Sequence, residues 1–246
     1  KDLEKIKNHN LKRQEICNKI YEDCENMLSK IDMKNQRVIA LFSKTWDKGV
    51  LGIVCSRLVE KYHKPVFLFS QDGDLLSGSG RSIDDINIHE LLSSLKDILE
   101  TFGGHSMAAG LTLKKEKFQD FVQKINSFAL NYISDDVFIP IKYYDQDIDE
   151  EDISLDFVKE LNRLEPFGCE NPRPKFKITT QNVEILPMKK FPQHANIKIG
   201  KLNLTYFNFL NKLVKITFSR QKSFIFEFQP RSTKGLVDDF DGGNYI

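Results

Sequence analysis

The pattern of apolar residues changes near residue 143 of the 246-residue sequence. Before that point, short β-branched runs alternate with longer amphipathic segments. This alternation predicts an α/β domain around a mainly parallel or mixed sheet. After residue 174, strand signals crowd together with little helix between them, which predicts a small antiparallel barrel or sandwich, with a five-stranded OB-like barrel as the leading choice. The sequence therefore predicts two domains of different architecture.

The expected elements follow from the spacing of apolar residues. Residues 1–31 predict one long helix, because apolar positions recur at helical spacing without an intervening Gly or Pro. The α/β domain is expected to contain strand 36–42, helix 50–63, strand 66–69, a Gly-rich strand 75–82, helix 87–100 and helix 115–133. The barrel strands are expected at 175–186, 194–199, 202–210, 212–219 and 222–230. The resulting boundaries are a connector helix 1–34, the α/β domain 35–134, an acidic linker with a short helix 135–174, the barrel 175–234 and a tail 235–246.

Charge is sorted by segment, although the whole chain has a formal net charge of only +1. The balance is +2 over 1–134, −8 over 135–169, +10 over 170–234 and −3 over 235–246. A segment of this length at +10 is a candidate surface for a polyanion, with a solubilising face as the alternative. The acidic run 145–152 lacks the glycine and the spacing of an EF-hand loop, so it predicts a solvated linker.

The sequence GSGRS, residues 78–82, is the first candidate binding motif. Gly78 and the second glycine would let a ligand approach the backbone, Ser79 and Ser82 add hydroxyls, and the Arg81 guanidinium suits a phosphate bidentately. Together they predict an anion or phosphate site. The alternative is a hairpin turn with a surface arginine.

The sequence GGHSMAAG, residues 103–110, is the second candidate. Gly103 and Gly104 would place His105 on a tight turn, where the imidazole could donate to a phosphate oxygen, assist proton transfer or help to ligate a metal. A hydrogen-bonded structural histidine is the alternative. Residues 1–134 contain no convincing cluster of Asp and His for divalent metals, so no metal site is expected in this chain.

The basic barrel is the third candidate, because aromatic platforms in a positive groove suit single-stranded nucleic acid. Its aromatic residues are Phe176, Phe191, Tyr206, Phe207, Phe209, Phe218, Phe224, Phe226 and Phe228. The alternation of Phe224, Phe226 and Phe228 puts them on one face, which favours the barrel interior for those three. The lysines that we select as phosphate contacts are Lys198, Lys201 and Lys215.

Several other classes of protein are disfavoured. The cysteines include no CxxC pair, which argues against a zinc site, and a chain of this size does not need disulfides. No P-loop, dinucleotide fingerprint or G-x-S-x-G motif occurs. No uncharged apolar run approaches the roughly 20 residues of a membrane span, and the first ten residues have no signal-peptide core. We therefore expect a reduced, cytoplasmic protein.

Four motifs in order resemble the RecJ family. TWDKGVLGIVCSRLVEKYHKPVFLF (45–69), GSGRS (78–82) and FGGHSMAAGL (102–111) follow the family's DHHA1 domain in order and spacing. LNRLEPFGCENPRPKF (161–176) is similar to the segment that leads into its OB domain, and the helix with NHNLKRQE (8–15) is similar to its connector helix.

Two departures from the family pattern accompany this resemblance. The family usually has a histidine after the tryptophan, where this chain has Asp47. The catalytic DHH motifs are absent from these 246 residues.

The resemblance implies a function for the chain. RecJ is a single-stranded-DNA-specific 5′-to-3′ exonuclease of the DHH phosphoesterase superfamily. By resemblance, Ser79 and Arg81 would hold the terminal 5′ phosphate, Gly78 and Ser82 would shape the turn, and His105 would approach the scissile region. The OB barrel would bind single-stranded DNA. Mn²⁺ or Mg²⁺ would be held by a DHH domain outside this chain, so these 246 residues alone are expected to be inactive.

Three alternatives remain open. One is a stand-alone single-stranded nucleic-acid-binding module. Another is a fragment of a DHH-superfamily phosphodiesterase that acts on short oligonucleotides or cyclic dinucleotides, and the third is the DHHA1-like tail of an alanyl-tRNA synthetase. The appended basic barrel argues against the last two.

Overall fold

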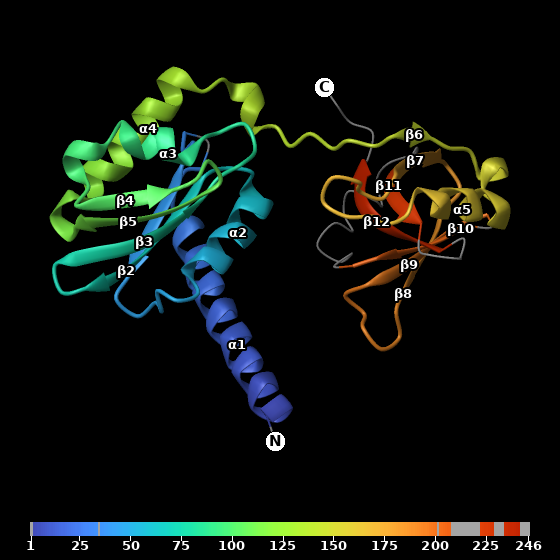
Figure 1. Cartoon of the computed structure of the whole chain (residues 1–246), viewed down its shortest axis with the longest axis horizontal. Helices are drawn as coiled ribbons and strands as arrows, with labels where there is room; N and C mark the ends of the chain where they lie inside the picture. Colours follow the sequence, from blue (N-terminus) through green and yellow to red (C-terminus); the bar gives the residue numbers. More distant parts are fainter. Residues whose placement is uncertain (1, 34, 201, 208–221, 229–233, 242–246) are drawn as a thin grey trace. The chain divides into compact units, whose positions relative to one another are not determined.

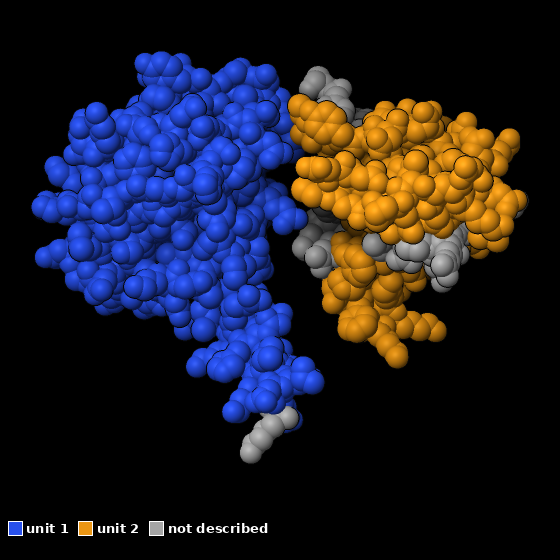
Figure 2. Space-filling model, in the orientation of Figure 1, with its two compact units in different colours: residues 1–140 blue, residues 141–246 orange. Residues whose placement is uncertain are grey.

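A computed structural model describes the chain except for residues 1, 34, 201, 208–221, 229–233 and 242–246. The chain divides into two compact units, Lys1–Pro140 and Ile141–Ile246, which are coloured separately in Figure 2. Each unit has its own hydrophobic core, so each is described by itself.

Unit 1 contains one five-stranded sheet (Figure 1). Strands β1 and β2 are parallel and all other neighbours are antiparallel, so the sheet is mixed, as expected. Across the sheet the strands lie in the order β1 (Ile39–Ser43), β2 (Val66–Asp72), β3 (Leu75–Arg81), β5 (Ala108–Lys114) and β4 (Thr101–Gly104).

Helices cover the two faces of this sheet. They are α1 (Asp2–Leu28), α2 (Leu51–Tyr62), α3 (Ile88–Ser93) and α4 (Phe118–Tyr132), with 3₁₀ turns at Lys96–Ile98, Lys115–Lys117 and Asp135–Phe138. Leu68 of β2 packs in one core with α1 and α2, whereas Phe67 and Phe69 pack in the other core with α3 and α4. This split follows from the period of two along a strand, which sends successive side chains to opposite faces.

The first half of α1 extends beyond the sheet (Figure 1). Leu3 and Ile6 are exposed there, whereas Cys17, Cys24 and Leu28 of the second half are buried. None of the described helices has both the length and the apolar character needed to cross a membrane.

Unit 2 contains a seven-stranded sheet. Its neighbours are antiparallel except for two parallel pairs, β6 with β7 and β10 with β12. The order is β6 (Gln146–Asp147), β7 (Lys175–Thr180), β11 (Lys222–Phe228), β12 (Lys234–Asp241), β10 (Leu202–Tyr206), β9 (Ala195–Ile199) and β8 (Glu184–Pro187). Helix α5 (Leu155–Leu161) and 3₁₀ turns at Glu150–Asp152 and Asn162–Leu164 precede β7.

The acidic segment is not the solvated linker that the sequence predicted. Ile148, Ile153 and Val158 are buried in the core of unit 2, and β6 pairs with β7. The carboxylates alternate with these apolar residues and stay outside, and Asp147 forms an ion pair with Lys177 at 3.3 Å. Because most residues of this segment are acidic, the sequence did not reveal that the segment packs as an edge of the sheet.

Other predictions about the elements also differ from the structure. The helix expected at 87–100 is the shorter α3 followed by a 3₁₀ turn, and the strand expected at 175–186 is two strands, β7 and β8. The hairpin of β4 and β5 was not expected, because its glycines and alanines carry no β-branched signal. Strand β12 occupies most of the predicted tail 235–246. The strand expected at 212–219 lies outside the described residues.

Candidate functional site

One half of a sheet face in unit 1 is left without large side chains. In the register of the sheet, Ser79 of β3 lies opposite Gly110 of β5, and Gly110 lies opposite Gly103 of β4. Both glycines are exposed, and a Cβ atom on Gly103 would meet no atom within 4 Å. We call the outward positions of β3, β5 and β4 the bare face. Backbone is accessible there to a ligand that lies flat on the sheet.

The bare face carries hydroxyls and cations. Ser77 pairs with Thr112, and Thr112 pairs with Thr101, so a second row of hydroxyl-bearing residues runs beside the row of Ser79. Lys114 of β5 and Arg81 of β3 mark the two ends of the face. No Asp or Glu occupies a strand position of this face. Sequence inspection missed the threonines, although the alternation in AGLTL could have shown them.

Arg81 is a half-buried cation at one end of the bare face. Its Nη1 donates to the carbonyl oxygen of Gly80 at 2.8 Å. Its guanidinium lies against the first turn of α2, where a Cβ atom on Gly52 would be 2.6 Å from Nη2. Among the described residues Arg81 forms no ion pair. Packing against α2 thus holds the guanidinium in place at one end of the bare face.

Ser79 presents its hydroxyl to the same face. That hydroxyl has no hydrogen-bond partner within the part of the chain that the structure describes. The carbonyl oxygen of Ser79 accepts a hydrogen bond from Cys55 Sγ at 3.2 Å. Burial raises the pKa of the Cys55 thiol to about 12, so the sulfur remains protonated and acts as the donor. Cys55 therefore fixes the strand beneath Ser79.

The two glycines of GSGRS do not face the side of the sheet from which a ligand was predicted to approach the backbone. A Cβ atom on Gly78 would be 2.4 Å from the Phe69 ring, and one on Gly80 would be 2.6 Å from the Phe67 ring. Both glycines therefore face the core and make room for phenylalanines of β2. The motif is also the end of an inner strand, β3, rather than a hairpin turn.

The predicted contact of the Ser82 hydroxyl with an anion also disagrees with the structure. It is buried, and its hydroxyl donates to the carbonyl oxygen of Ile86 at 2.6 Å, so it is not available to an anion. Its backbone N–H donates to the carbonyl oxygen of Met107 at 3.0 Å. Ser82 therefore ties the end of β3 to the loop between β4 and β5.

His105 lies on the tight turn that the sequence predicted. Gly104 has φ +146°, and a Cβ atom there would be 2.2 Å from the carbonyl oxygen of Ala108, so only glycine fits. The His105 N–H donates to that same oxygen at 2.8 Å, and the His105 side chain is exposed. Because Ala108 pairs with Arg81, the histidine turn lies at the Arg81 end of the bare face.

Asp47, which replaces the usual histidine of the family pattern, caps a turn. Its Oδ1 accepts from the N–H of Gly49 at 2.8 Å, just before α2 begins. The carboxylate is therefore engaged in shaping the loop that leads into α2.

In unit 2 the aromatic residues separate into two groups. Phe224, Phe226 and Phe228 are buried, which confirms the prediction for those three, and Phe176 and Tyr206 are buried with them. Two others, Phe191 and Phe207, are exposed. Phe209 and Phe218 lie outside the described residues.

The three selected lysines remain predicted phosphate contacts. Lys198 is exposed on β9. Lys201 and Lys215 fall in segments that the structure does not describe.

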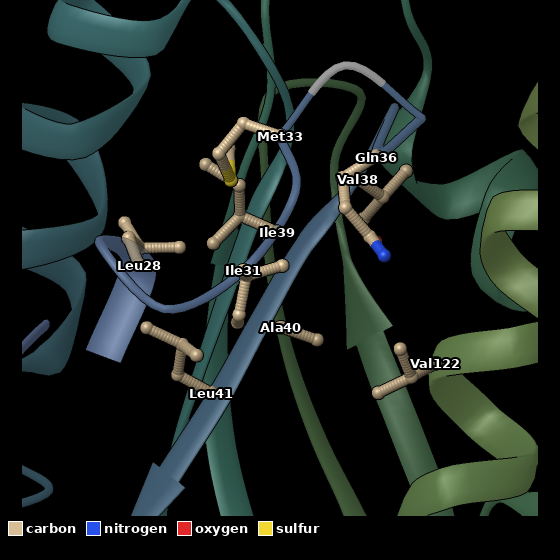
Figure 3. A pocket seen from close by; sticks show the side chains of 9 residues that line it. All are labelled: Leu28, Ile31, Met33, Gln36, Val38, Ile39, Ala40, Leu41 and Val122. Carbon is tan, nitrogen blue, oxygen red and sulfur yellow. The ribbon is translucent and has the colours of Figure 1, made fainter.

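Two other features do not form part of this site. Among the described residues, no group of three or more His, Cys, Asp or Glu side chains could hold a metal ion. An apolar pocket lies beside β1, the strand at the opposite edge of the sheet from β4 (Figure 3). Leu28, Met33 and Val122 help to line it, and none of the described residues that line it is charged.

Comparison with protein families now identifies both units. Residues 35–131 match the DHHA1 domain, and residues 144–236 match the RecJ OB domain. The chain belongs to the RecJ family. The OB match begins inside the acidic segment, in agreement with the packing of β6 in unit 2.

Relatives in the RecJ family extend well beyond this chain. The single-stranded-DNA-specific exonuclease RecJ of Bacillus subtilis is 37% identical over 167 residues, which cover 67% of this chain and 21% of that protein. The exonuclease of the same name from Haemophilus influenzae is 32% identical over 152 residues, 58% of this chain and 26% of that protein.

A solved structure shares the fold. RecJ of Thermus thermophilus in complex with Mn²⁺ matches with a TM-score of 0.77 and 22% identity, over 96% of this chain and 35% of that chain. The chain thus spans about a third of that structure and between a fifth and about a quarter of the curated relatives.

Proposed function

We propose that this chain is the substrate-binding region of a single-stranded-DNA-specific 5′-to-3′ exonuclease. The bare face of unit 1 holds the terminal 5′ phosphate, and the OB domain binds the strand. The carrying observation is Arg81, a half-buried guanidinium without an ion-pair partner in the described chain, beside the unbonded hydroxyl of Ser79. The relatives named single-stranded-DNA-specific exonuclease support the same assignment.

Each residue of the bare face has a distinct task in this proposal. Arg81 donates two N–H groups to the phosphate, a geometry that suits its planar fork. Ser79 donates its hydroxyl to a phosphate oxygen. Gly103 and Gly110 allow the phosphodiester to lie close to the sheet, because no side chain intervenes. His105, at the Arg81 end, approaches the scissile region and positions it.

Hydrolysis is assigned to a DHH domain outside this chain, which would hold Mn²⁺ or Mg²⁺. We therefore expect the purified chain to bind single-stranded DNA and to leave it intact when Mn²⁺ is added. Metal-dependent digestion by the purified 246 residues, measured on a labelled oligonucleotide, would contradict this division of labour.

The phosphate role is tested with two oligodeoxynucleotides that differ only in a 5′ phosphate or a 5′ hydroxyl. Fluorescence anisotropy should show that the wild-type chain prefers the phosphorylated end by about tenfold or more, because hydrogen bonds to a charged group contribute roughly 1.5–3 kcal/mol. Arg81→Ala should abolish this preference.

The matched control is Lys114→Ala, at the other end of the bare face. It should weaken binding of both oligonucleotides equally and retain the preference. A preference that persists in Arg81→Ala would remove Arg81 from the phosphate site.

A further inference from the structure

A second row of the bare face carries three hydroxyls side by side. Ser77 of β3, Thr112 of β5 and Thr101 of β4 lie opposite one another in the register of the neighbouring strands. None of these three hydroxyls has a hydrogen-bond partner within the described chain. We call the three residues the hydroxyl row. Ser70 of β2 would continue it, but its hydroxyl donates to the carbonyl oxygen of Trp46 at 2.7 Å, so the row of unbonded hydroxyls ends at β3.

The core on the opposite face of the sheet fixes the direction of the hydroxyl row. Leu76 and Leu113, which are sequence neighbours of Ser77 and Thr112, are completely buried. Because successive side chains of a strand point to opposite faces, Ser77 and Thr112 point away from that core. Thr101 is exposed on the edge strand β4. The fold therefore holds the hydroxyl row in place on the accessible side of the sheet.

The hydroxyl row lies behind the site proposed for the terminal phosphate. Arg81, Ser79 and Ser77 follow one another at alternate positions of β3, and the turn with His105 lies at the Arg81 end. In the proposed function, a strand with a single 5′ phosphate extends from Ser79 towards His105 and leaves the hydroxyl row empty. Neighbouring rows are two residues apart, about 6.6 Å along a strand. The hydroxyl row is therefore within reach of groups attached to the 5′ phosphate itself.

A second cation lies beyond the hydroxyl row. Lys114 is the next outward residue of β5 after Thr112, is exposed and forms no ion pair among the described residues. Leu75 lies opposite Lys114 and separates it from Asp72 of β2, which belongs to the same row. The bare face thus carries hydroxyls between Arg81 and Lys114. Hydroxyl donors between two cations suit a short chain of linked phosphoryl groups.

We propose that the hydroxyl row and Lys114 bind the outer phosphoryl groups of a 5′-triphosphate, whose innermost phosphate is held by Ser79 and Arg81. The ligand is a nucleoside 5′-triphosphate group, either at the end of a DNA strand or in a free nucleotide. The hydroxyls donate to the outer phosphates, and Lys114 neutralises part of their charge. This inference rests on the proposed 5′-phosphate site and adds a ligand that the proposed function does not require.

The test compares three oligothymidylates of equal length that carry a 5′ hydroxyl, a 5′ monophosphate or a 5′ triphosphate. Each has a 3′ fluorophore, and EDTA removes metal ions from the titration. Fluorescence anisotropy should show that the wild-type chain binds the triphosphate about tenfold more tightly than the monophosphate, because it gains hydrogen bonds to a charged group. Thr112→Val removes one hydroxyl with little change of shape. It should reduce this gain to about threefold or less and retain the preference for the monophosphate over the hydroxyl.

Two variants serve as controls, and a third repeats the test. Thr205→Val makes the same change at a half-buried strand position of unit 2 and should leave both ratios of affinity unchanged. Lys114→Gln should lower the gain from the triphosphate and leave the preference for the monophosphate over the hydroxyl intact. Thr101→Val changes an exposed position of the edge strand, where folding is least affected, and should also lower the gain from the triphosphate.

Competition with free nucleotides distinguishes the two sources of the triphosphate group. Displacement of the triphosphorylated strand by dTTP at lower concentration than by dTMP would show that the site also takes a free nucleotide. Displacement by neither would confine the ligand to strand ends. Either result supports the triphosphate site, provided that the strand itself shows the gain.

The remaining outcomes separate this inference from the proposed function. If the wild-type chain does not distinguish a 5′ monophosphate from a 5′ hydroxyl, the proposed phosphate site and the role of the hydroxyl row are both wrong. If that preference is present but the triphosphate binds no more tightly than the monophosphate, the role of the hydroxyl row alone is wrong. The same holds if Thr112→Val and Thr101→Val keep the full gain, or lose the same factor for all three oligothymidylates.

Discussion

The two units build their candidate surfaces in opposite ways. In unit 1 the bare face arises because Gly103 and Gly110 remove side chains from one side of the sheet, so that backbone and a few fixed groups are accessible. In unit 2, by contrast, Phe191 and Phe207 are large side chains that remain exposed. Small residues thus expose the backbone of unit 1 to a ligand, whereas unit 2 offers the faces of aromatic rings.

The cores of the two units share one feature and differ in another. Phenylalanines pack directly on one another in both, with ring centroids 4.7 Å apart for Phe42 and Phe118 of unit 1 and 5.2 Å apart for Phe226 and Phe228 of unit 2. In unit 1, however, Phe67 and Phe69 fit only because Gly80 and Gly78 lie opposite them. Loss of a buried ring should therefore be costly in either unit, and gain of a methyl group at these glycines should be costly in unit 1.

The largest effect is expected from Phe226→Ala. This side chain is completely buried, so its removal should lower the free energy of unfolding of unit 2 by about 3–5 kcal/mol. Urea unfolding followed by far-UV circular dichroism should then show an earlier transition. The fluorescence of Trp46, which is buried in unit 1, should keep its midpoint.

Phe207→Ala is the matched control for this prediction, because the ring is half exposed and should change stability by only about 0.5 kcal/mol. If Phe226→Ala shifts the Trp46 transition by as much as the circular dichroism transition, the two units unfold as one and the comparison between them fails for stability.

A smaller effect is expected from Gly80→Ala. The added Cβ would be 2.6 Å from the Phe67 ring, and overpacking of this kind costs about 1–3 kcal/mol. Urea unfolding followed by Trp46 fluorescence should measure this loss in unit 1. Gly103→Ala adds the same methyl group where no atom lies within 4 Å, so its stability should stay close to that of the wild type.

These two glycine variants also test the assignment of faces. Gly103→Ala places its methyl group on the bare face and should weaken binding of a 5′-phosphorylated oligonucleotide without loss of stability. Equal destabilisation by both variants would contradict the placement of Gly80 toward the core and Gly103 toward solvent.

Much of this arrangement could be predicted from the sequence. The motif GSGRS located Ser79 and Arg81, and GGH located a glycine-dependent turn, because both signals are local in the chain. The orientations of Gly78 and Ser82 could not be predicted from the motif alone. Gly78 faces Phe69 and the Ser82 hydroxyl donates to Ile86, and neither Phe69 nor Ile86 belongs to the motif. Strand alternation found the interior of unit 2, but proximity of Phe191 to His194 and Phe207 needs the strand register.

The acidic segment shows a second limit of sequence reasoning. Its charge of −8 predicted a solvated linker, yet Ile148 and Ile153 enter the core of unit 2. The net charge of a segment reflects its exposed residues. A few apolar residues spaced along it are enough to bury its other side in a core.

The smallest predicted effect is a loss of stability of unit 1 as the pH rises. Burial raises the pKa of the Cys55 thiol from its usual 9.0 to about 12, so the folded chain keeps a proton that the unfolded chain loses. This contribution to stability is fully present below about pH 9 and is lost as the pH rises towards 12. Between pH 9 and pH 10 the loss should be about 1 kcal/mol.

Urea unfolding followed by Trp46 fluorescence at several pH values should measure this decline. Cys55→Ala should be less stable at pH 8 but should decline less between pH 9 and pH 10, because no buried thiol remains at that position. Cys169→Ser, which alters an exposed thiol of unit 2, should decline as the wild type does. Parallel curves for Cys55→Ala and the wild type would show that Cys55 does not keep its proton in the folded chain, and its role as the donor to Ser79 would then fail.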